Sequence, residues 1–390
     1  MGTGKTPTTI RAMAESPQRD WVIVCPASLK LNWKREIEKW WPNHPPIQMH
    51  KGRGVKRMYR GISIINYDVL VGLRPTEFFG LICDESHYIK TPGAKRSRAV
   101  YRLVKKAESN WFLTGTPILN NAIDLYQTCR LMHPYFEKWS RFQFGLTYTQ
   151  SHNSPFGWKF SGVKNERSLL KLLKEFSSRV TKDRVLDLPA KHRIHVPLST
   201  ENLEQGVLKH LEDQERMLKT KNFKLTKEVK DELATSRREL GESKVKDAVN
   251  FIKVVLENEK PVLVFAHHKS VIKGIVESLK GDITWAKITG DTTMSQRQDF
   301  VDEFQYGVYN VLVCNIKAAG VGLTLTKAKT AIFVEQDWTP ANNLQAEDRI
   351  HRIGQESKCT IYYLNYENSI DDYISKVNYE KESGIKKLFS

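Results

Sequence analysis

The chain has 390 residues, 40% of them hydrophobic, and a formal net charge of +17. This length exceeds one ordinary compact domain and fits two, with room for an insertion. No run of eighteen apolar residues and no secretory signal pattern occur, so we expect an intracellular protein without a membrane span. The positive charge favours a polyanionic partner such as nucleic acid.

Five cysteines are scattered along the chain without the CxxC spacing of metal sites. They are Cys25, Cys83, Cys129, Cys314 and Cys359. Four lie in or beside apolar runs, where cysteine usually serves as a small core residue. The adjacent His267 and His268 have no partner ligands at metal spacing. The pattern argues against a disulfide framework and against a zinc site, and we expect no metal cluster.

Two stretches of the chain have the same alternating rhythm. Short runs rich in Val, Ile and Phe are typical of buried parallel strands, and helical patterns such as Leu29–Trp41 and Ser295–Phe304 lie between them. In the first stretch the runs are Trp21–Cys25, Ile62–Ile65, Phe79–Cys83 and Trp111–Leu113. In the second they are Val262–Ala266, Ile283–Ile288, Val311–Cys314, Ala331–Val334 and Ile361–Leu364. Strands that alternate with helices predict an α/β fold with two doubly wound parallel-sheet lobes.

The segment between the two lobes is different in composition. From Glu201 to Leu240 it is crowded with Lys, Glu and Asp, and Leu203, Val207, Leu208 and Leu211 recur at helical spacing. This pattern predicts a helical connector. We therefore expect a first lobe over residues 1–195, a connector over 196–242, a second lobe over 243–370 and a terminal helix over 371–390.

A glycine-rich phosphate loop is predicted at the start of the sequence, in Gly2-Thr3-Gly4-Lys5-Thr6. Glycines let the backbone N–H groups face a phosphate, the lysine neutralises the β and γ phosphates, and the threonine hydroxyl is a ligand for Mg²⁺. The full pattern GxxxxGK[ST] would begin before Met1, so its first part and the strand that feeds it are not in this sequence.

Two carboxylates follow the strand-like run that ends at Cys83. Asp84 and Glu85 would lie at the carboxyl edge of the sheet, beside the phosphate loop. We expect Asp84 to hold Mg²⁺ through water and Glu85 to orient and polarise the attacking water.

Two further turns are candidates for contact with ligand. Thr114 and Thr116 follow an apolar run and could link the nucleotide site to a bound strand. The second turn, Gly320–Thr324, contains glycines that permit close backbone approach to a phosphate chain or to the nucleotide.

The second lobe contains the segment Gln345–Gln355, in which Arg349 and Arg352 are three residues apart. On a helix, this spacing puts both side chains on one face. A guanidinium that reaches the γ-phosphate from the opposite lobe is an arginine finger, which accelerates phosphoryl transfer by orders of magnitude in other systems.

Taken in this order, the motifs resemble the Swi/Snf-type branch of the superfamily-two helicases. The phosphate loop resembles motif I, Asp84-Glu85-Ser86-His87 resembles motif II, and Thr114–Pro117 resembles motif III. Val24–Leu29 with Asn32 and Trp33 resembles motif Ia, and Ile65–Asp68 resembles motif Ib. In the second lobe, Val264–Ala266 with Lys269 and Ser270, Ala318–Thr324, and Gln345–Gln355 resemble motifs IV, V and VI, and Asp337–Pro340 fits the same branch.

The resemblance implies two RecA-like lobes that hydrolyse ATP with Mg²⁺ and move along nucleic acid, most typically duplex DNA, without efficient strand separation. It implies nucleotide contacts from Gly322 and Gln345 in addition to the phosphate loop. It also implies contacts to the nucleic-acid backbone from eight residues: Pro26, Ser28, Asn66, Tyr67, Thr114, Thr116, Lys269 and Thr324. Two basic clusters near these motifs would add phosphate contacts: Lys51, Arg53, Lys56, Arg57 and Arg60, and Lys95, Arg96 and Arg98.

Within this branch the short region between the lobes most resembles the compact annealing-helicase and fork-remodelling subgroup. One departure is that the family's glutamine-bearing adenine contact, upstream of motif I, is missing from the sequence. Two alternatives to a DNA translocase stay open at this point. One is an RNA-directed helicase, and the other is a nucleic-acid-binding module without turnover, suggested by the truncated phosphate loop.

Overall fold

The structure is a computed structural model that describes residues 2–17, 20–52, 54, 56–58, 60–74, 79–119, 121–154, 157–200, 227–319 and 322–389. The chain divides into two compact units. Unit 1 comprises residues 1–184 and 381–390, and unit 2 comprises residues 185–380. Among the helices of the described residues, none has both the length and the apolar character needed to cross a lipid bilayer.

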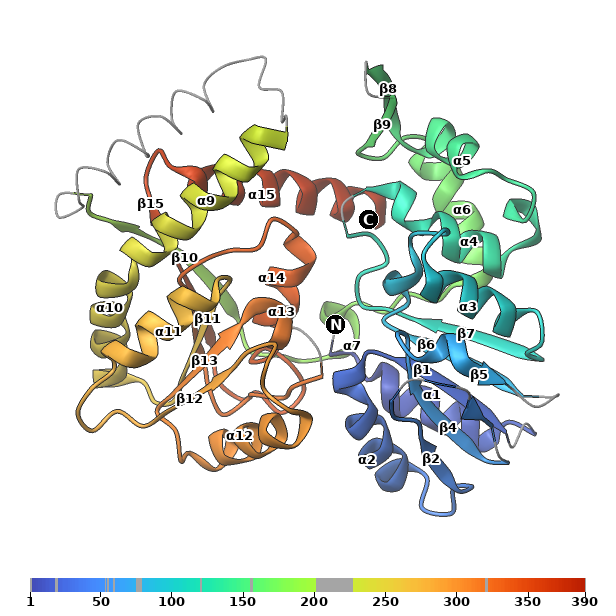
Figure 1. Cartoon of the computed structure of the whole chain (residues 1–390), viewed down its shortest axis with the longest axis horizontal. Coiled ribbons are helices and arrows are strands. Elements are labelled where there is room, and N and C mark those ends of the chain that lie inside the picture. Colours follow the sequence, from blue (N-terminus) through green and yellow to red (C-terminus); the bar gives the residue numbers. More distant parts are fainter. Residues whose placement is uncertain are drawn as a thin grey trace. The chain divides into compact units, whose positions relative to one another are not determined.

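Unit 1 contains a five-stranded parallel sheet with the strand order β2-β4-β1-β6-β7 (Figure 1). The strands are β1 (Trp21–Cys25), β2 (Ile47–Met49), β4 (Ile62–Asn66), β6 (Gly80–Asp84) and β7 (Ser109–Leu113). The first, third and fourth predicted runs of this lobe agree with β1, β6 and β7 to within two residues, and the second agrees with β4. β2 is an additional edge strand that was not predicted. Its three residues are all partly exposed, so they do not read as a buried strand.

Both faces of this sheet are buried. Val22, Val24, Leu81 and Cys83 point to one face, where they pack against helix α3 (Lys95–Val104). The alternate residues of the same strands are buried on the other face, on the side of α1 (Lys5–Glu15) and α2 (Lys30–Trp40) (Figure 1). Burial on both faces explains why these strands are continuous apolar runs.

A second hydrophobic core in unit 1 is built from helices and a hairpin. Its helices are α4 (Tyr126–Met132), α5 (Arg141–Tyr148) and α6 (Glu166–Phe176), and its hairpin joins β8 (Gln150–Ser154) to β9 (Gly157–Ser161). Residues such as Ile123, Phe136, Phe144 and Leu169 form this core. The sequence analysis did not separate it from the first lobe. Unit 1 also contains β3 (Lys56–Arg57) paired with β5 (Leu73–Arg74), and all but the last residue of α7 (Lys182–Val185).

Unit 2 contains a six-stranded parallel sheet with the order β10-β15-β14-β11-β13-β12. The strands are β10 (Lys191–Leu198), β11 (Val262–Ala266), β12 (Trp285–Ile288), β13 (Val311–Asn315), β14 (Thr330–Phe333) and β15 (Cys359–Tyr366). The helices are α9 (Lys227–Ser243), α10 (Val245–Asn258), α11 (Lys269–Ser278), α12 (Met294–Tyr306), α13 (Ile316–Ala319), α14 (Pro340–Glu347) and α15 (Ile370–Phe389), whose last residues are assigned to unit 1.

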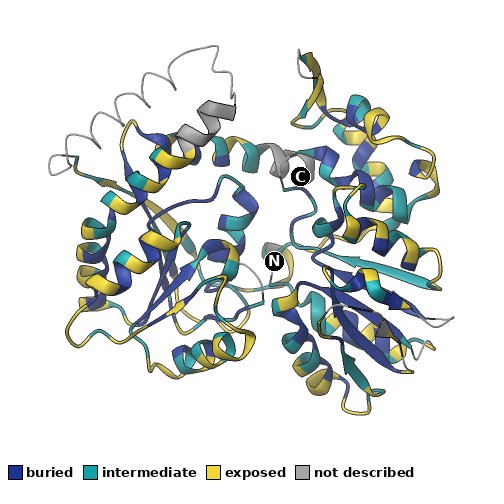
Figure 2. Ribbon diagram, in the orientation of Figure 1, coloured by how far each residue is buried: buried dark blue, intermediate teal, exposed yellow. Residues whose placement is uncertain are grey.

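The sheet of unit 2 is covered on both faces. Val262, Val264 and Val313 pack against α10 and α11, whereas Leu263, Phe265 and Leu312 contribute to a separate core on the opposite face, which includes residues of α12. Figure 2 shows the strands of this sheet largely buried and the outer surfaces of the helices exposed. Both units therefore have the α/β fold with parallel sheets that the sequence predicts.

The boundary between the units differs from the prediction. Residues 191–195, assigned to the first lobe, belong to β10, which pairs with β15 along its whole length. These residues are mostly polar and exposed, and Pro197 follows within the same strand, which matches an edge strand more than a buried one. Of the predicted connector, residues 201–226 lie outside the described residues, and α9 covers residues 227–243. All five cysteines are buried and without disulfides.

Candidate nucleotide site and arginine segment

The phosphate loop leads directly into helix α1. Gly4 is the N-cap residue with φ 78°, and Gly2 has φ 70°, backbone conformations that side chains with a Cβ rarely adopt. Lys5 and Thr6 are the first two residues of the helix. The amide N–H groups of a first helical turn have no partner within the helix and carry the positive end of its dipole. This helix start can therefore hold a phosphate group.

The two predicted acidic residues follow directly at the end of β6. Asp84 is the last residue of the strand and Glu85 the next, and both are buried. The indole N–H of Trp33 in α2 donates to Oδ2 of Asp84 at 2.9 Å, and the backbone N–H of Glu85 donates to Oδ1 at 2.9 Å. Each carboxylate oxygen thus has one hydrogen bond and keeps acceptor capacity for a further ligand.

The positive charge near the buried carboxylate of Asp84 is too small to offset the cost of ionising it. Burial and the neighbouring Glu85 raise the pKa of Asp84 to about 6, although the Trp33 hydrogen bond and the charge of Lys5 act in the opposite direction. The charge of Lys5 acts on Asp84, which agrees with the predicted position of the acidic residues beside the phosphate loop. A buried carboxylate whose charged form is disfavoured is a fitting ligand for a divalent cation, which would offset the cost of burial.

Glu85 has an unusual backbone conformation, with φ 50° and ψ 53°. Left-handed conformations cost a non-glycine residue about 1–2 kcal/mol and are frequent at functional sites. Its Oε2 atom lies 3.3 Å from Nδ1 of His87, which is 3.4 Å from the hydroxyl of Thr114. That hydroxyl in turn accepts the backbone N–H of Thr116 at 3.0 Å. A chain of polar contacts thus joins Glu85 to the predicted turn at Thr114–Thr116.

The predicted nucleic-acid contacts of motifs Ia and Ib occupy different environments. Pro26 is the buried N-cap of a short 3-10 helix (Ala27–Leu29), and Ser28 within it is partly exposed. Asn66 ends β4 and is largely buried. Tyr67 is only 2% exposed, and its hydroxyl donates to the backbone carbonyl of Asp84 at 2.8 Å. Tyr67 therefore supports the acidic residues from within the core, and its contact with nucleic acid stays a prediction.

The basic clusters are described only in part. Arg53 and the side chain of Lys56 lie outside the described residues. Lys51, Arg57 and Arg60 are exposed, as are Lys95 and Arg98. Arg96 is half-buried, with its guanidinium carbon 5.5 Å from the ring centre of Tyr88.

In unit 2, the arginine segment, which we define as residues 345–355, follows a different geometry from the predicted one. Helix α14 ends at Glu347, so Arg349 and Arg352 lie in the turns beyond it and not on one helix face. They nevertheless converge, because Nη1 of each donates to the same backbone carbonyl of Leu323, at 3.0 Å and 2.9 Å.

The two arginines differ in burial. Arg349 is 7% exposed and donates from Nε to the carbonyl of Gln345 at 3.0 Å, whereas Arg352 is more accessible. The side chain of Gln345 is also buried. Its contact with the nucleotide stays a prediction. Arg352 is the better candidate for a group that contacts a ligand.

The remaining predicted residues of unit 2 are near the arginine segment or at a strand end. Gly322 has φ 77° and precedes Leu323, and Thr324 is partly exposed. Gly320 and Val321 lie outside the described residues. Lys269 begins α11 and pairs with Asp291 at 2.5 Å on the surface.

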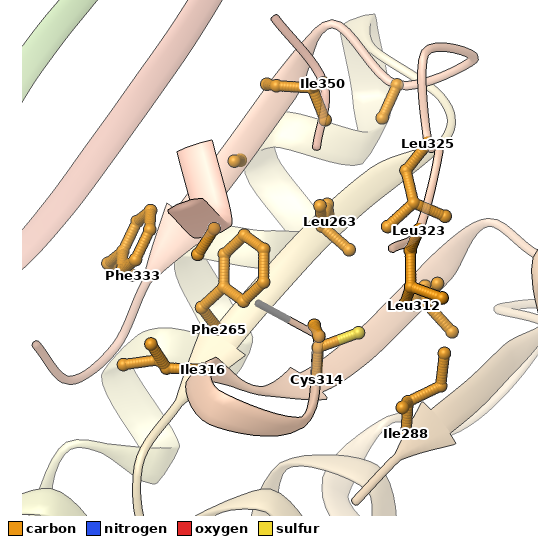
Figure 3. Close-up of a cluster of buried hydrophobic side chains, with 14 of the residues drawn as sticks. Leu263, Phe265, Ile288, Leu312, Cys314, Ile316, Leu323, Leu325, Phe333 and Ile350 are labelled. Carbon is orange, nitrogen blue, oxygen red and sulfur yellow. The ribbon is translucent and has the colours of Figure 1, made fainter. Parts of the chain in front are cut away.

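Hydrophobic packing and one amide side chain fix the arginine segment to the turn at residues 323–328. Ile350, Leu323 and Leu325 are members of the hydrophobic core that contains Leu263 and Leu312 (Figure 3). The side-chain amide of Gln355 donates to the carbonyls of Thr326, Ala328 and Ile350 at 2.9–3.1 Å. These contacts fix the backbone that presents the arginines.

A buried carboxylate holds the same segment on its other side, and the sequence analysis missed it. Glu347 is fully buried; Lys191 Nζ lies 2.6 Å from one of its oxygens, Arg193 Nε lies 2.7 Å from the other, and Tyr363 donates its hydroxyl at 2.6 Å. His351 Nε2 lies 2.8 Å from the carbonyl of Pro189. Lys191 and Arg193 lie more than 150 positions from Glu347 in the sequence, so no local pattern could have identified these ion pairs.

Two family models match the chain. Residues 1–248 match the model of the SNF2-related domain, and residues 243–354 match the helicase conserved C-terminal domain. The chain is 33% identical, over 98% of its length, to the SWI/SNF-related matrix-associated actin-dependent regulator of chromatin subfamily A-like protein 1 of Xenopus laevis. It is 32% identical, over 95% of its length, to the human DNA annealing helicase and endonuclease ZRANB3, and 30% identical, over 99%, to an uncharacterized ATP-dependent helicase of Mycoplasma genitalium.

These matches cover 41%, 36% and 39% of the relatives, so the chain spans about two fifths of the length of the curated relatives that it resembles. The family model alone covers well over half of this chain. The resemblance that the motifs predict is confirmed: the chain belongs to the SNF2 family, with an SNF2-related domain followed by a helicase C-terminal domain.

Proposed function

We propose that the chain is an ATP-hydrolysing motor that moves along DNA and uses Mg²⁺. The observation that carries the proposal is the group of Lys5, Asp84 and Glu85 in unit 1, where a helix start suited to phosphate lies beside two buried carboxylates. This combination of groups has the chemistry of phosphoryl transfer to water.

Each residue has a separate task in this proposal. Lys5 and the amides of α1 bind the phosphate chain, and Thr6 and Asp84 hold Mg²⁺, which when bound neutralises charge on the phosphate oxygens. Glu85 orients the attacking water and accepts its proton at the carboxylate. His87 and Thr114, which continue from Glu85, make this carboxylate sensitive to the turn at Thr114–Thr116.

Arg352 and Arg349 complete the proposed chemistry from unit 2. A guanidinium stabilises the negative charge that develops on the transferred phosphoryl group. We assign this contact to Arg352 because it is the more accessible of the two, and we assign Arg349 to holding the segment. Gly322 and Gln345 remain proposed nucleotide contacts.

DNA is the proposed polymer, because one relative is named a DNA annealing helicase and endonuclease and another a regulator of chromatin. The net charge of +17 supports a polyanionic partner. Pro26, Ser28, Asn66, Thr114, Thr116, Lys269 and Thr324 are the proposed contacts to its backbone. Such contacts are indifferent to sequence and weaken steeply with salt.

Phosphate release by the chain, measured with no nucleic acid, with blunt duplex DNA and with duplex RNA, tests the proposal. We expect DNA to stimulate release more than RNA does, and we expect the apparent affinity for DNA to fall strongly between low and physiological salt. Greater stimulation by RNA would support an RNA-directed helicase. Binding of DNA without any turnover would support a binding module and overturn the motor.

A further inference from the structure

The β8–β9 hairpin of unit 1 carries surface chemistry that the proposed ATPase does not use. The hairpin extends from the helical core built by α4, α5 and α6 (Figure 1). Its strands pair antiparallel from Gln150 opposite Ser161 to Ser154 opposite Gly157. The chemistry of the motor accounts for neither its position nor its composition.

The base of the hairpin is fixed to that helical core. Phe160 packs so closely on Gly145 of α5 that a Cβ atom there would lie 2.3 Å from its ring. Asn121 donates its side-chain amide to the carbonyl of Phe160 at 3.1 Å, and the backbone N–H of Lys164 donates to the carbonyl of Tyr148 at 2.9 Å. The base of the hairpin is therefore fixed without a ligand.

Two large aromatic side chains lie exposed beside each other on this scaffold. Trp158 in β9 is 45% exposed and Phe142 in α5 is 42% exposed, with ring centres 5.3 Å apart in an edge-to-face arrangement. The ring centres of Phe142 and Phe160 are 6.2 Å apart, so the exposed pair is connected to the aromatic ring that anchors the hairpin. Exposed aromatic residues in contact are a recurring feature of binding surfaces.

The charged residues of the segment that carries the pair all have one sign. No Asp or Glu occurs from residue 138 to residue 165, whereas Lys138, Arg141, Lys159 and Lys164 do. The guanidinium carbon of Arg141 lies 6.0 Å from the ring centre of Phe160, on the aromatic side. In the register of the hairpin, Lys159 is opposite His152 and thus points to the other side of the two-stranded ribbon.

We infer that this aromatic and basic surface binds unpaired single-stranded DNA. Aromatic rings stack on the faces of bases, which a duplex keeps covered by neighbouring bases, and cations beside them contact phosphates. Duplex DNA presents phosphates, sugars and base edges but keeps its base faces stacked, so the exposed rings would find no base face to stack on. The inference rests on the proposed action on DNA and adds that the substrate contains a single-stranded portion.

The test compares Trp158→Ala with a matched control, Trp40→Ala, in the full chain. Trp40, in α2 of the same unit, is 47% exposed, and its indole contacts the acidic Glu36, so it controls for removal of an exposed tryptophan. Binding of fluorescently labelled oligo-dT and of a labelled blunt duplex is followed by anisotropy, and duplex-stimulated phosphate release is measured in parallel.

We expect Trp158→Ala to weaken oligo-dT binding by about 5- to 150-fold, the loss of one stacked base, and Trp158→Phe to restore most of it. Binding of the blunt duplex and its stimulation of phosphate release should stay within about twofold of the parent. Arg141→Ala, which removes the cation on the aromatic side, should lower the salt dependence of oligo-dT binding by about one phosphate contact.

Three results overturn the inference: unchanged oligo-dT affinity in Trp158→Ala, an equal loss in Trp40→Ala, or an equal loss of oligo-dT and duplex binding. The proposed motor fails separately, through absent phosphate release in the parent chain, since oligo-dT binding is measured without ATP.

Discussion

The indole N–H of Trp33 donates a hydrogen bond to the carboxylate of Asp84 at 2.9 Å, with both side chains buried. Helix α2 thus supplies a neutral donor to the acidic residue proposed to hold Mg²⁺. A donor of this kind stabilises the ionised carboxylate without competing for the charge that the metal ion brings. The contact links motif Ia directly to the nucleotide site.

Trp33→Phe should remove this donor and keep most of the ring volume. We expect the free energy of unfolding to fall by about 1–3 kcal/mol, because a buried carboxylate loses one partner. We also expect the apparent affinity for Mg²⁺ and ATP to change. Urea unfolding and the Mg²⁺ dependence of phosphate release check both effects.

Trp40→Phe is the control, because Trp40 makes the same indole–carboxylate contact, to Glu36 at 2.9 Å, on the exposed surface. It should change stability by less than about 0.5 kcal/mol. Equal effects of the two substitutions would contradict the role assigned to Trp33.

Asp84→Asn should reveal the raised pKa of Asp84 as a dependence of stability on pH. Since the folded-state pKa, about 6, lies above the ordinary value of 3.8, protonation favours the folded state. The contribution is fully present below about pH 4 and is lost as the pH rises to about 6. Without Mg²⁺ the variant should therefore be more stable than the parent above pH 6, by up to roughly 3 kcal/mol, and similar to it near pH 4.

Chemical unfolding at several pH values, with and without Mg²⁺, measures this difference. Added Mg²⁺ should stabilise the parent at pH 7 and leave the variant unchanged. A constant difference between the two proteins from pH 4 to pH 8 would show that the carboxylate titrates normally.

Glu85→Gln should separate binding of ATP from its hydrolysis. The amide retains the size of the side chain but cannot accept a proton from water, so we expect phosphate release to fall by about 10²- to 10⁴-fold with ATP affinity nearly unchanged. Lys5→Ala should weaken both, because the lysine contacts the phosphates in the ground state as well. Hydrolysis at the parent rate in Glu85→Gln would disprove its assignment as the base.

Arg352→Ala and Arg349→Ala should have different consequences, although both arginines donate to the carbonyl of Leu323. We expect Arg352→Ala to reduce turnover by about 10³-fold or more and to leave DNA binding and stability nearly intact. Arg349→Ala should lower the free energy of unfolding by about 1–3 kcal/mol, because two backbone carbonyls lose a donor. Thermal unfolding and phosphate release, measured on both variants, distinguish a contact with substrate from a structural role.

The sequence predicted the buried strands well because each is a short, continuous apolar run that parallel sheets require. The end of β6 followed from the same pattern, and with it the position of Asp84 and Glu85. Arg349 and Arg352 do lie close together, but the predicted reason, a shared helix face, is wrong. Helix α14 ends before them, and their shared acceptor, Leu323, joins them.

Features that depend on distant parts of the chain could not be predicted in this way. Tyr67 lies in a predicted nucleic-acid motif, but in the structure its hydroxyl donates a hydrogen bond to the carbonyl of Asp84. The two residues are near each other because β4, β1 and β6 pair in parallel register. No role was predicted for Glu347, which is buried and whose partners come from β10 and β15.

The position of β10 affects how the protein can be dissected. A fragment that starts at residue 243, where the match to the helicase C-terminal domain begins, would omit β10 and with it Lys191 and Arg193. Glu347 would then carry an uncompensated charge inside the protein, and β15 would become an open edge prone to self-association. A separately expressed second unit therefore has to start near residue 185. Strand β10, whose first residues were assigned to the first lobe, is an integral part of the second unit.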